Sequence, residues 1–237
     1  MKLTKTLFIY LTFSIIAALL LIFLVVTTPS HTSSLSTSEK GVIASVLILC
    51  CCFGISFTLR PNWVRNYFNR SKKQGKNTSS QEKRSFQGHH PECLTFQSHT
   101  IRWRQKIWCA GCFGLFIGLC GSIILMIFYM IVDFQLTKII ALLLLPSGFF
   151  ILAVVYIEIL HRSKHATVHA LLNSFLPLSF FLIIITVGEI TGDLVYGLFS
   201  ILLCFLWLDT RIQLSKSHHR ILCRNCVESC KMFTESS

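Results

Sequence analysis

The chain has 237 residues, of which 53% are hydrophobic and 14% charged, and its mean hydropathy is +0.64. Charged residues make up about a quarter of an ordinary soluble domain, so this composition excludes that class. Lys and Arg outnumber Asp and Glu by 22 to 10, and the distribution of these cations along the chain must therefore decide between nucleic-acid binding and membrane orientation.

Six apolar segments follow one another along the chain, each long enough to cross a hydrocarbon core of about 30 Å as a helix of about 20 residues. They run from Leu7 to Thr27, Gly41 to Leu59, Trp108 to Val132, Ile139 to Leu160, Thr167 to Val187, and Glu189 to Leu208. Lipid offers no hydrogen-bond partner to an open backbone, so the sequence predicts an all-α integral membrane protein, a six-helix bundle. The first segment is predicted to be an uncleaved anchor, because it is long and lacks a signal-peptide cleavage site.

The positions of the Lys and Arg residues along the chain agree with this topology. All 22 Lys and Arg residues except Lys40 and Lys138 fall before the first span, within residues 60–107, within 162–164 or after residue 208. The positive-inside rule then places both termini in the cytosol, with the protein in the plasma membrane. The cations set orientation and attract anionic lipid headgroups, above all in the basic stretch 69–87, and no nucleic-acid partner is expected.

This topology divides the chain into four parts. Residues 1–59 form transmembrane helices one and two, and 60–107 a cytosolic basic linker with a Cys/His loop. Residues 108–208 form helices three to six, and 209–237 a cytosolic Cys/His tail. The loop and the tail together are predicted to form a small Cys/His-rich cap on the cytosolic side.

The spans carry small and helix-breaking residues at defined positions. Glycines recur at three- and four-residue steps along one side of the third span, at Gly111, Gly114, Gly118 and Gly121. Such a stripe allows a second helix to approach closely. Pro146 and Pro177 interrupt the fourth and fifth spans; they are ordinary membrane-helix kinks or, with Asn173, the border of a polar cavity between these spans.

The loop contains two closely spaced pairs of possible metal ligands. His90 and Cys93 form HxxC in GHHPEC, and Cys109 and Cys112 form CxxC in CAGC. Two such pairs on separate turns can supply the four tetrahedral ligands of zinc, so the spacing predicts a zinc-knuckle-like site. His89 and His99 are alternative imidazole ligands.

The tail repeats the composition in HHRILCRNCVESC. On a helix its thiols and imidazole would share one face, at His219, Cys223, Cys226 and Cys230. The outer two would be about 16 Å apart at 1.5 Å per residue, so these four residues cannot enclose one ion. Cys223 and Cys226 complete the loop's site, form a second metal site or act as thiols. The alternative is an amphipathic helix on the membrane surface whose cysteines face lipid or are palmitoylated.

The chemistry of the loop leaves two functions open. Cys109 and Cys112 open the third span, where the positive end of the helix dipole favours a thiolate, and thiolates serve both metal binding and redox chemistry. The first hypothesis is a scaffold or channel-like membrane protein with structural zinc. The alternative is a membrane thiol-redox or metal-dependent enzyme that uses the CxxC pairs, and inert thiols are a third reading. The spans hold almost no mid-membrane ionisable residue, which argues against a coupled transporter.

Through HHPECLTFQSH and CAGCFGLFIG the chain resembles a family of small multi-pass prokaryotic membrane proteins of unknown function, in a variant of archaeal type. In that family a loop with His and Cys leads into a CAxCxG element that opens a transmembrane helix. The resemblance is best from His89 to Gly121. It implies the architecture and the importance of Cys93, Cys109 and Cys112, and it supplies no reaction. Many members carry Arg and Thr where this chain has Gly111 and Phe113.

Overall fold

The computed structural model of the chain describes residues 5–28, 35–59, 86–87, 100–103, 106–132, 138–161 and 165–224. Its elements are, in order, α1 (Lys5–Thr27), α2 (Thr37–Leu59), β1 (Phe86–Gln87), β2 (Thr100–Trp103), β3 (Lys106–Cys109), α4 (Ala110–Val132), α5 (Lys138–His161), α6 (Ala166–Thr191) and α7 (Leu194–Arg224). Within these residues, six helices are long and apolar enough to cross a membrane. The predicted fold class, a six-helix bundle of the multi-pass membrane type, is thereby confirmed at this level.

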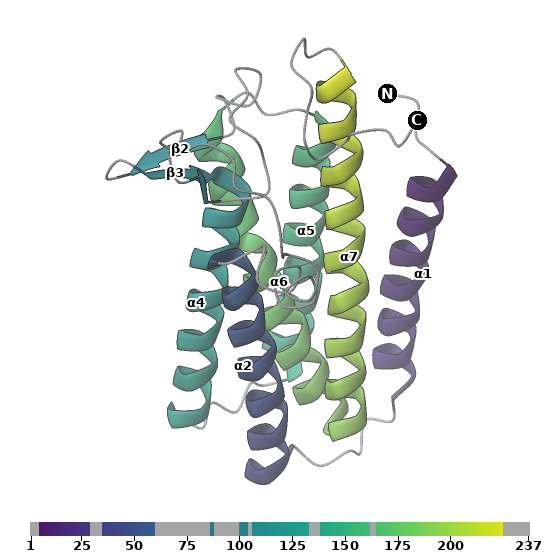
Figure 1. Cartoon of the computed structure of the whole chain (residues 1–237). Helices are drawn as coiled ribbons and strands as arrows, with labels where there is room; N and C mark the ends of the chain where they lie inside the picture. The colour runs from purple at the N-terminus through teal and green to yellow at the C-terminus, as the bar shows by residue number, and fades with distance from the viewer. Residues whose placement is uncertain are drawn as a thin grey trace, which may run out of the picture.

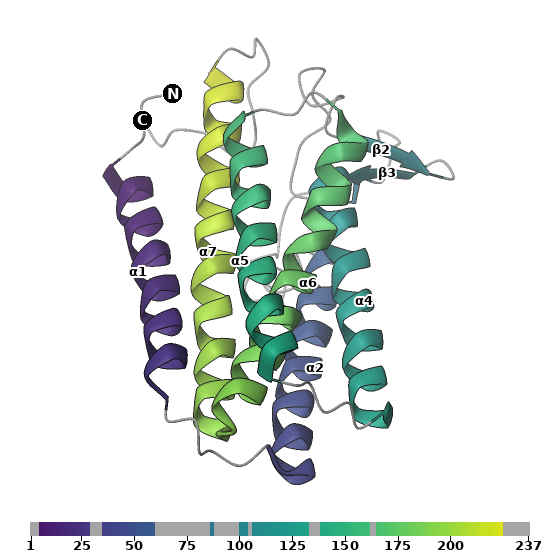
Figure 2. The same ribbon diagram turned by 180° about the vertical axis from the view of Figure 1, so that it is seen from behind.

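The six helices run alternately up and down in one bundle, so α1 begins at the same end at which α7 finishes (Figure 1). We call this end proximal and the opposite end distal. Helix α6 lies at the centre, between α4, α5 and α7, as Figure 2 shows from behind. Of its membrane-spanning stretch 61% is buried within the protein, against at most 33% for the other five. The central position of α6 means that a side chain on it can reach three neighbouring helices.

Glycines fix the close contact between α4 and α6. A Cβ atom added at Gly114 would lie 1.9 Å from the backbone oxygen of Ala170, and one at Gly118 would lie 2.2 Å from that of Ser174. No side chain fits there, because the obstacle is the backbone of the neighbouring helix. The prediction that the glycine stripe admits a second helix is confirmed, and that helix is α6.

A two-residue turn joins α6 to α7 at the distal end. Gly192 has the left-handed φ of 63° that ends a helix, and its N–H donates to the Gly188 carbonyl. The carboxylate of Asp193 then caps α7 by accepting from the Val195 N–H at 2.7 Å. The fifth span therefore includes Glu189, and the predicted start of the sixth at that residue is wrong by five positions. Helix α7 also continues to Arg224, well past the predicted end of the span.

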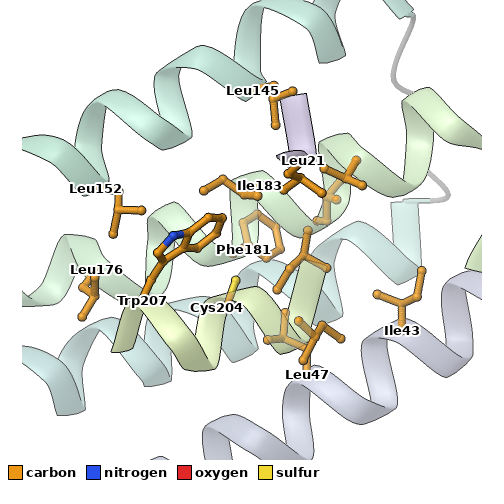
Figure 3. Close-up of a cluster of buried hydrophobic side chains, with 14 of the residues drawn as sticks. Leu21, Ile43, Leu47, Leu145, Leu152, Leu176, Phe181, Ile183, Cys204 and Trp207 are labelled. Carbon is orange, nitrogen blue, oxygen red and sulfur yellow. The ribbon is translucent and has the colours of Figure 1, made fainter. Parts of the chain in front are cut away.

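The core is centred on Trp207 of α7, which is almost completely buried (Figure 3). Its ring packs edge-on against Phe149 of α5 at 5.6 Å and stacks with Phe180 of α6 at 6.4 Å. Its indole N–H donates to the backbone oxygen of Ser14 at 3.1 Å, and its own carbonyl accepts from the Tyr156 hydroxyl at 2.6 Å. One residue thus links α1, α5, α6 and α7.

Large apolar side chains also cover the outside of the bundle. Phe8, Ile131, Leu143 and Phe150 are all more than 60% exposed. Apolar surface of this extent is unfavourable in water, so it fits contact with lipid chains.

A small three-stranded sheet precedes α4 at the proximal end, in the order β1, β3, β2. Strand β3 pairs with β1 in parallel and with β2 in antiparallel fashion. Its strands lie in the second half of the predicted Cys/His loop and at the start of the predicted third span.

Candidate functional site

Two cysteines lie where the sheet meets the bundle. Cys109 is the last residue of β3 and is buried, and Cys112 is half-buried in the first turn of α4. The side chains of these two residues are hydrogen-bonded to each other. Neither is in a disulfide bond with another described residue. The CAGC motif therefore presents a pair of adjacent thiols at the proximal end.

The strand register brings both ends of the predicted Cys/His loop to this pair. Gln87, the last residue of β1, pairs with Trp108, and Thr100, the first residue of β2, pairs with Cys109 itself. Residues 88–99 connect these two points, and they carry His89, His90, Cys93 and His99. Those four predicted ligands lie outside the described residues. The described strands nevertheless fix where the segment must begin and end.

Gly111, between the two cysteines, allows two cationic or polar side chains to approach α4. A Cβ atom at this position would lie 3.2 Å from Nη2 of Arg211 and 3.2 Å from Nε2 of His169. Arg211 comes from α7 and His169 from α6, so the first turn of α4 packs against both helices. Arg211 also interacts electrostatically with the thiols of Cys112 and Cys109.

Hydrogen bonds connect these groups into a network. Nδ1 of His169 lies 3.1 Å from Oε1 of Glu158, on α5. Asn173 donates from Nδ2 to the backbone oxygen of His169 at 2.6 Å, and its Oδ1 accepts from Nη2 of Arg211. We call Cys109, Cys112, Glu158, His169, Asn173 and Arg211 the proximal polar cluster. Helices α4, α5, α6 and α7 all contribute to it.

One atom of the cluster has no hydrogen bond. Nε of Arg211 is buried and lacks a partner among the described residues. A buried donor without an acceptor is costly, and more so when the group is charged. Among the described residues, the guanidinium of Arg211 therefore has one buried donor that is not satisfied.

Sequence reasoning did not find Arg211, because it counted this residue among the cations that follow the last span. Glu158 likewise gained no role from the sequence, and its partner is His169 on the next helix. A weak signal existed in the four-residue step from His169 to Asn173, which puts both on one face of α6. Only the packing of α5 and α7 against that face makes it a cluster.

The remaining predicted ligands are in the tail. Cys223 and His219 lie in the last turns of α7, where the backbone alone is described, and Cys226 and Cys230 lie outside the described residues. No three His, Cys, Asp or Glu side chains converge as metal ligands within the described part of the chain. The zinc site is consequently a prediction of which the structure describes two members, Cys109 and Cys112.

A second buried polar group lies at the distal end. Nζ of Lys40, on α2, is 2.9 Å from Oε1 of Glu189, on α6, and both side chains are at most 5% exposed. The Tyr129 hydroxyl of α4 donates to the same carboxylate oxygen, and Lys40 lies 5.3 Å above the centre of the Tyr129 ring. The sequence predicts Lys40 on the outer side, just before the second span, and Glu189 at the outer start of the sixth. In the structure they are a pair within the bundle.

An apolar cavity of about 80 Å³ lies between α2, α4, α6 and α7. Leu115, Pro177, Phe180, Cys204 and Leu208 are part of its lining. Asn173 is hydrogen-bonded to the backbone oxygen of His169 and to Arg211, and Pro177 borders this apolar cavity.

The chain was compared with known proteins. No protein-family model matches it, and neither a curated protein nor a solved structure is detectably similar to it. The family resemblance at HHPEC and CAGC therefore stays a prediction. In the proximal polar cluster, two adjacent thiols lie near the guanidinium group of Arg211.

Proposed function

We propose that the protein is a membrane scaffold whose proximal face carries a zinc-binding Cys/His cap, with His90, Cys93, Cys109 and Cys112 as ligands. The observation that carries this proposal is the register of the small sheet. Gln87 pairs with Trp108, and Thr100 pairs with Cys109. The segment 88–99, which carries His90 and Cys93, is therefore attached at both ends to strands that lie next to the CxxC pair.

The length of the segment is compatible with a shared site. A chain spans at most about 3.6 Å per residue, so His90 lies within about 11 Å of the Gln87 position, and Cys93 within about 22 Å. His99 is adjacent to Thr100 and can replace His90. Both pairs can therefore approach one ion without a rearrangement of the described strands.

Zinc is the metal that this ligand set favours. Thiolate and imidazole ligands in closely spaced pairs are typical of structural zinc sites with four protein ligands. In the cytosol, where the charge distribution predicts this face to lie, thiols stay reduced and available. An apolar core separates the proximal polar cluster from the Lys40–Glu189 pair at the distal end. This core favours a scaffold over a channel-like protein.

The tail cysteines belong to a different site in this proposal. Nη2 of Arg211 lies beside Gly111, and Cys223 is twelve residues farther along the same helix, or about 18 Å at 1.5 Å per residue. This separation along α7 favours a separate site for Cys223 over one shared with Cys109 and Cys112. We therefore assign Cys223 and Cys226 to a second metal or thiol site.

The test is the metal content of the full-length protein purified in detergent. We expect zinc bound at the loop site in the wild type, and its loss in the double variant Cys109→Ser, Cys112→Ser. The matched control is Cys52→Ser, which removes an exposed thiol of α2. Because the tail can bind zinc of its own, the measured quantity is the difference between double variant and control. Equal zinc in both would contradict the proposal.

A second candidate function, thiol–disulfide exchange, is favoured by the contact between the two thiols and by the nearby Arg211. Here Cys109 and Cys112 would lose two protons and two electrons, forming one S–S bond and reducing a substrate disulfide to two thiols. This function predicts zinc-free protein, rapid alkylation of Cys109 or Cys112, and a two-hydrogen mass loss after incubation with oxidised glutathione. Slow alkylation and an unchanged mass would exclude it.

A further inference from the structure

We propose that the apolar cavity between α2, α4, α6 and α7 is a binding site for the acyl chain of a membrane phospholipid, which enters sideways from the bilayer between α2 and α7. The site goes beyond the proposed function and is independent of the zinc-binding cap and of the proximal polar cluster. The depth of the cavity, its shape, the side chains that create it and its lateral access all favour this occupant.

The cavity lies at mid-depth in the bundle and is elongated along the bundle axis. On three helices its lining extends over a step of seven residues, from Leu47 to Gly54 on α2, Pro177 to Ile184 on α6 and Ile201 to Leu208 on α7. Seven residues correspond to about 10 Å of helix. The stretch on α6 begins eleven residues after the start of that helix and ends seven before its last residue. A hydrocarbon core is about 30 Å thick, so only the chains of a lipid reach this depth.

Small side chains at facing positions create the cavity. Cys50, Cys51 and Gly54 of α2 and Cys204 of α7 all line it, among Leu, Ile and Phe side chains that are larger. Protein interiors are otherwise close-packed, and an unfilled void forfeits the contacts of the side chains around it. Apolar cavities exclude water and bind apolar molecules. A hydrocarbon chain would supply the missing contacts without bringing a polar atom into the bundle.

The cavity lies next to the lipid-facing surface of the bundle. Phe205 of α7 lines the cavity and is 50% exposed, and Cys50 of α2 is half-buried. Leu49 and Phe53, which flank this part of α2, are highly exposed and belong to the apolar outer surface. Ile184 of α6, in contrast, is completely buried and lines the inner side. A chain can therefore enter from the bilayer between α2 and α7 and end against α6.

The experiment is photolabelling of the full-length protein in mixed micelles of detergent and a phospholipid that carries a diazirine near the end of one acyl chain. Labelled residues are identified by mass spectrometry after irradiation. We expect label on Ile184 or Cys204, which are at most 6% exposed and therefore protected from lipid at the outer surface. Leu143, which is 71% exposed, reports that outer lipid. Label confined to exposed residues of the outer surface would overturn the inference.

Filling the cavity should abolish the inner label. The double variant Cys51→Leu, Cys204→Leu places two larger apolar side chains in the cavity, so the label on Ile184 should fall to background while the label on Leu143 persists. The matched control is Cys52→Leu, the same substitution at an exposed position of α2 outside the described lining. Equal label on Ile184 in the filled variant and in the control would contradict the site.

A competition measurement on the wild type decides the identity of the occupant, and it does not require the filled variant to fold. Added unlabelled phospholipid should lower the label on Ile184 relative to that on Leu143, whereas an isoprenoid alcohol at the same concentration should leave this ratio unchanged. Displacement by the isoprenoid alcohol as effectively as by phospholipid, or no displacement by phospholipid, would overturn the assignment to an acyl chain.

Discussion

Lys40 and Glu189 form an ion pair inside the bundle, with Nζ and Oε1 2.9 Å apart and both side chains almost fully buried. The pair joins the beginning of α2 to the end of α6, and the Tyr129 hydroxyl brings α4 to the same carboxylate. Charged residues at membrane depth are expensive unless they are paired, which makes this contact a determinant of how the distal end assembles.

Glu189→Gln should strongly destabilise the protein, because it leaves the Lys40 ammonium buried opposite a neutral amide. Removal of one partner of a buried pair costs about 3–5 kcal/mol. The measurement is the midpoint of thermal unfolding in detergent. The double variant Lys40→Met, Glu189→Gln removes both charges and should recover part of the loss. A double variant less stable than Glu189→Gln would show that the ion pair is not the cause.

Gly114→Ala should separate α4 from α6, since the new Cβ would lie 1.9 Å from the backbone oxygen of Ala170. Overpacking of a helix contact typically costs about 1–3 kcal/mol, and here the obstacle is backbone and cannot rotate away. Gly121→Ala is the control on the same helix, because its Cβ would meet the tip of Leu178 at 3.6 Å, an ordinary contact. Unfolding midpoints that fall equally in the two variants would contradict the proposed role of the glycine stripe.

The cation distribution predicts that the proximal end faces the cytosol. An epitope placed after residue 237 should react with antibody only in permeabilised cells, and one inserted within 29–34 should react in intact cells. The physical reason is that translocation of Lys- and Arg-rich loops is disfavoured. Reaction of the C-terminal epitope in intact cells would reverse the topology, and would place the thiols of the loop in an oxidising compartment.

The sequence predicts the spans well because their signal is local. Twenty apolar residues identify a membrane helix without reference to any neighbour, and the predicted spans agree with α1, α2, α4 and α5 to within a few residues. The boundary between α6 and α7 was misplaced because Gly188 and Glu189 look like a loop in isolation. In the structure Glu189 is stabilised by Lys40 and Tyr129, which come from helices far away in the sequence.

In the candidate site, too, one part is predicted by the sequence and another part depends on the packing of the helices. CxxC is visible in the sequence as a pair of thiols, because a three-residue step across the start of a helix brings them together. The sequence does not assign Arg211 and His169 to this site, because no local pattern around them links them to Cys109 or Cys112. Their approach depends on Gly111, a residue whose lack of a side chain has meaning only when α6 and α7 are packed against α4.

The sequence by itself determined that this is a multi-pass helical protein, where its spans lie and that thiols open the third of them, because composition and short-range spacing govern those properties. Only the tertiary structure decided which charges meet. The Lys40–Glu189 pair and the position of Arg211 beside the CxxC thiols arise from contacts between helices more than 90 residues apart, and no local pattern encodes such contacts.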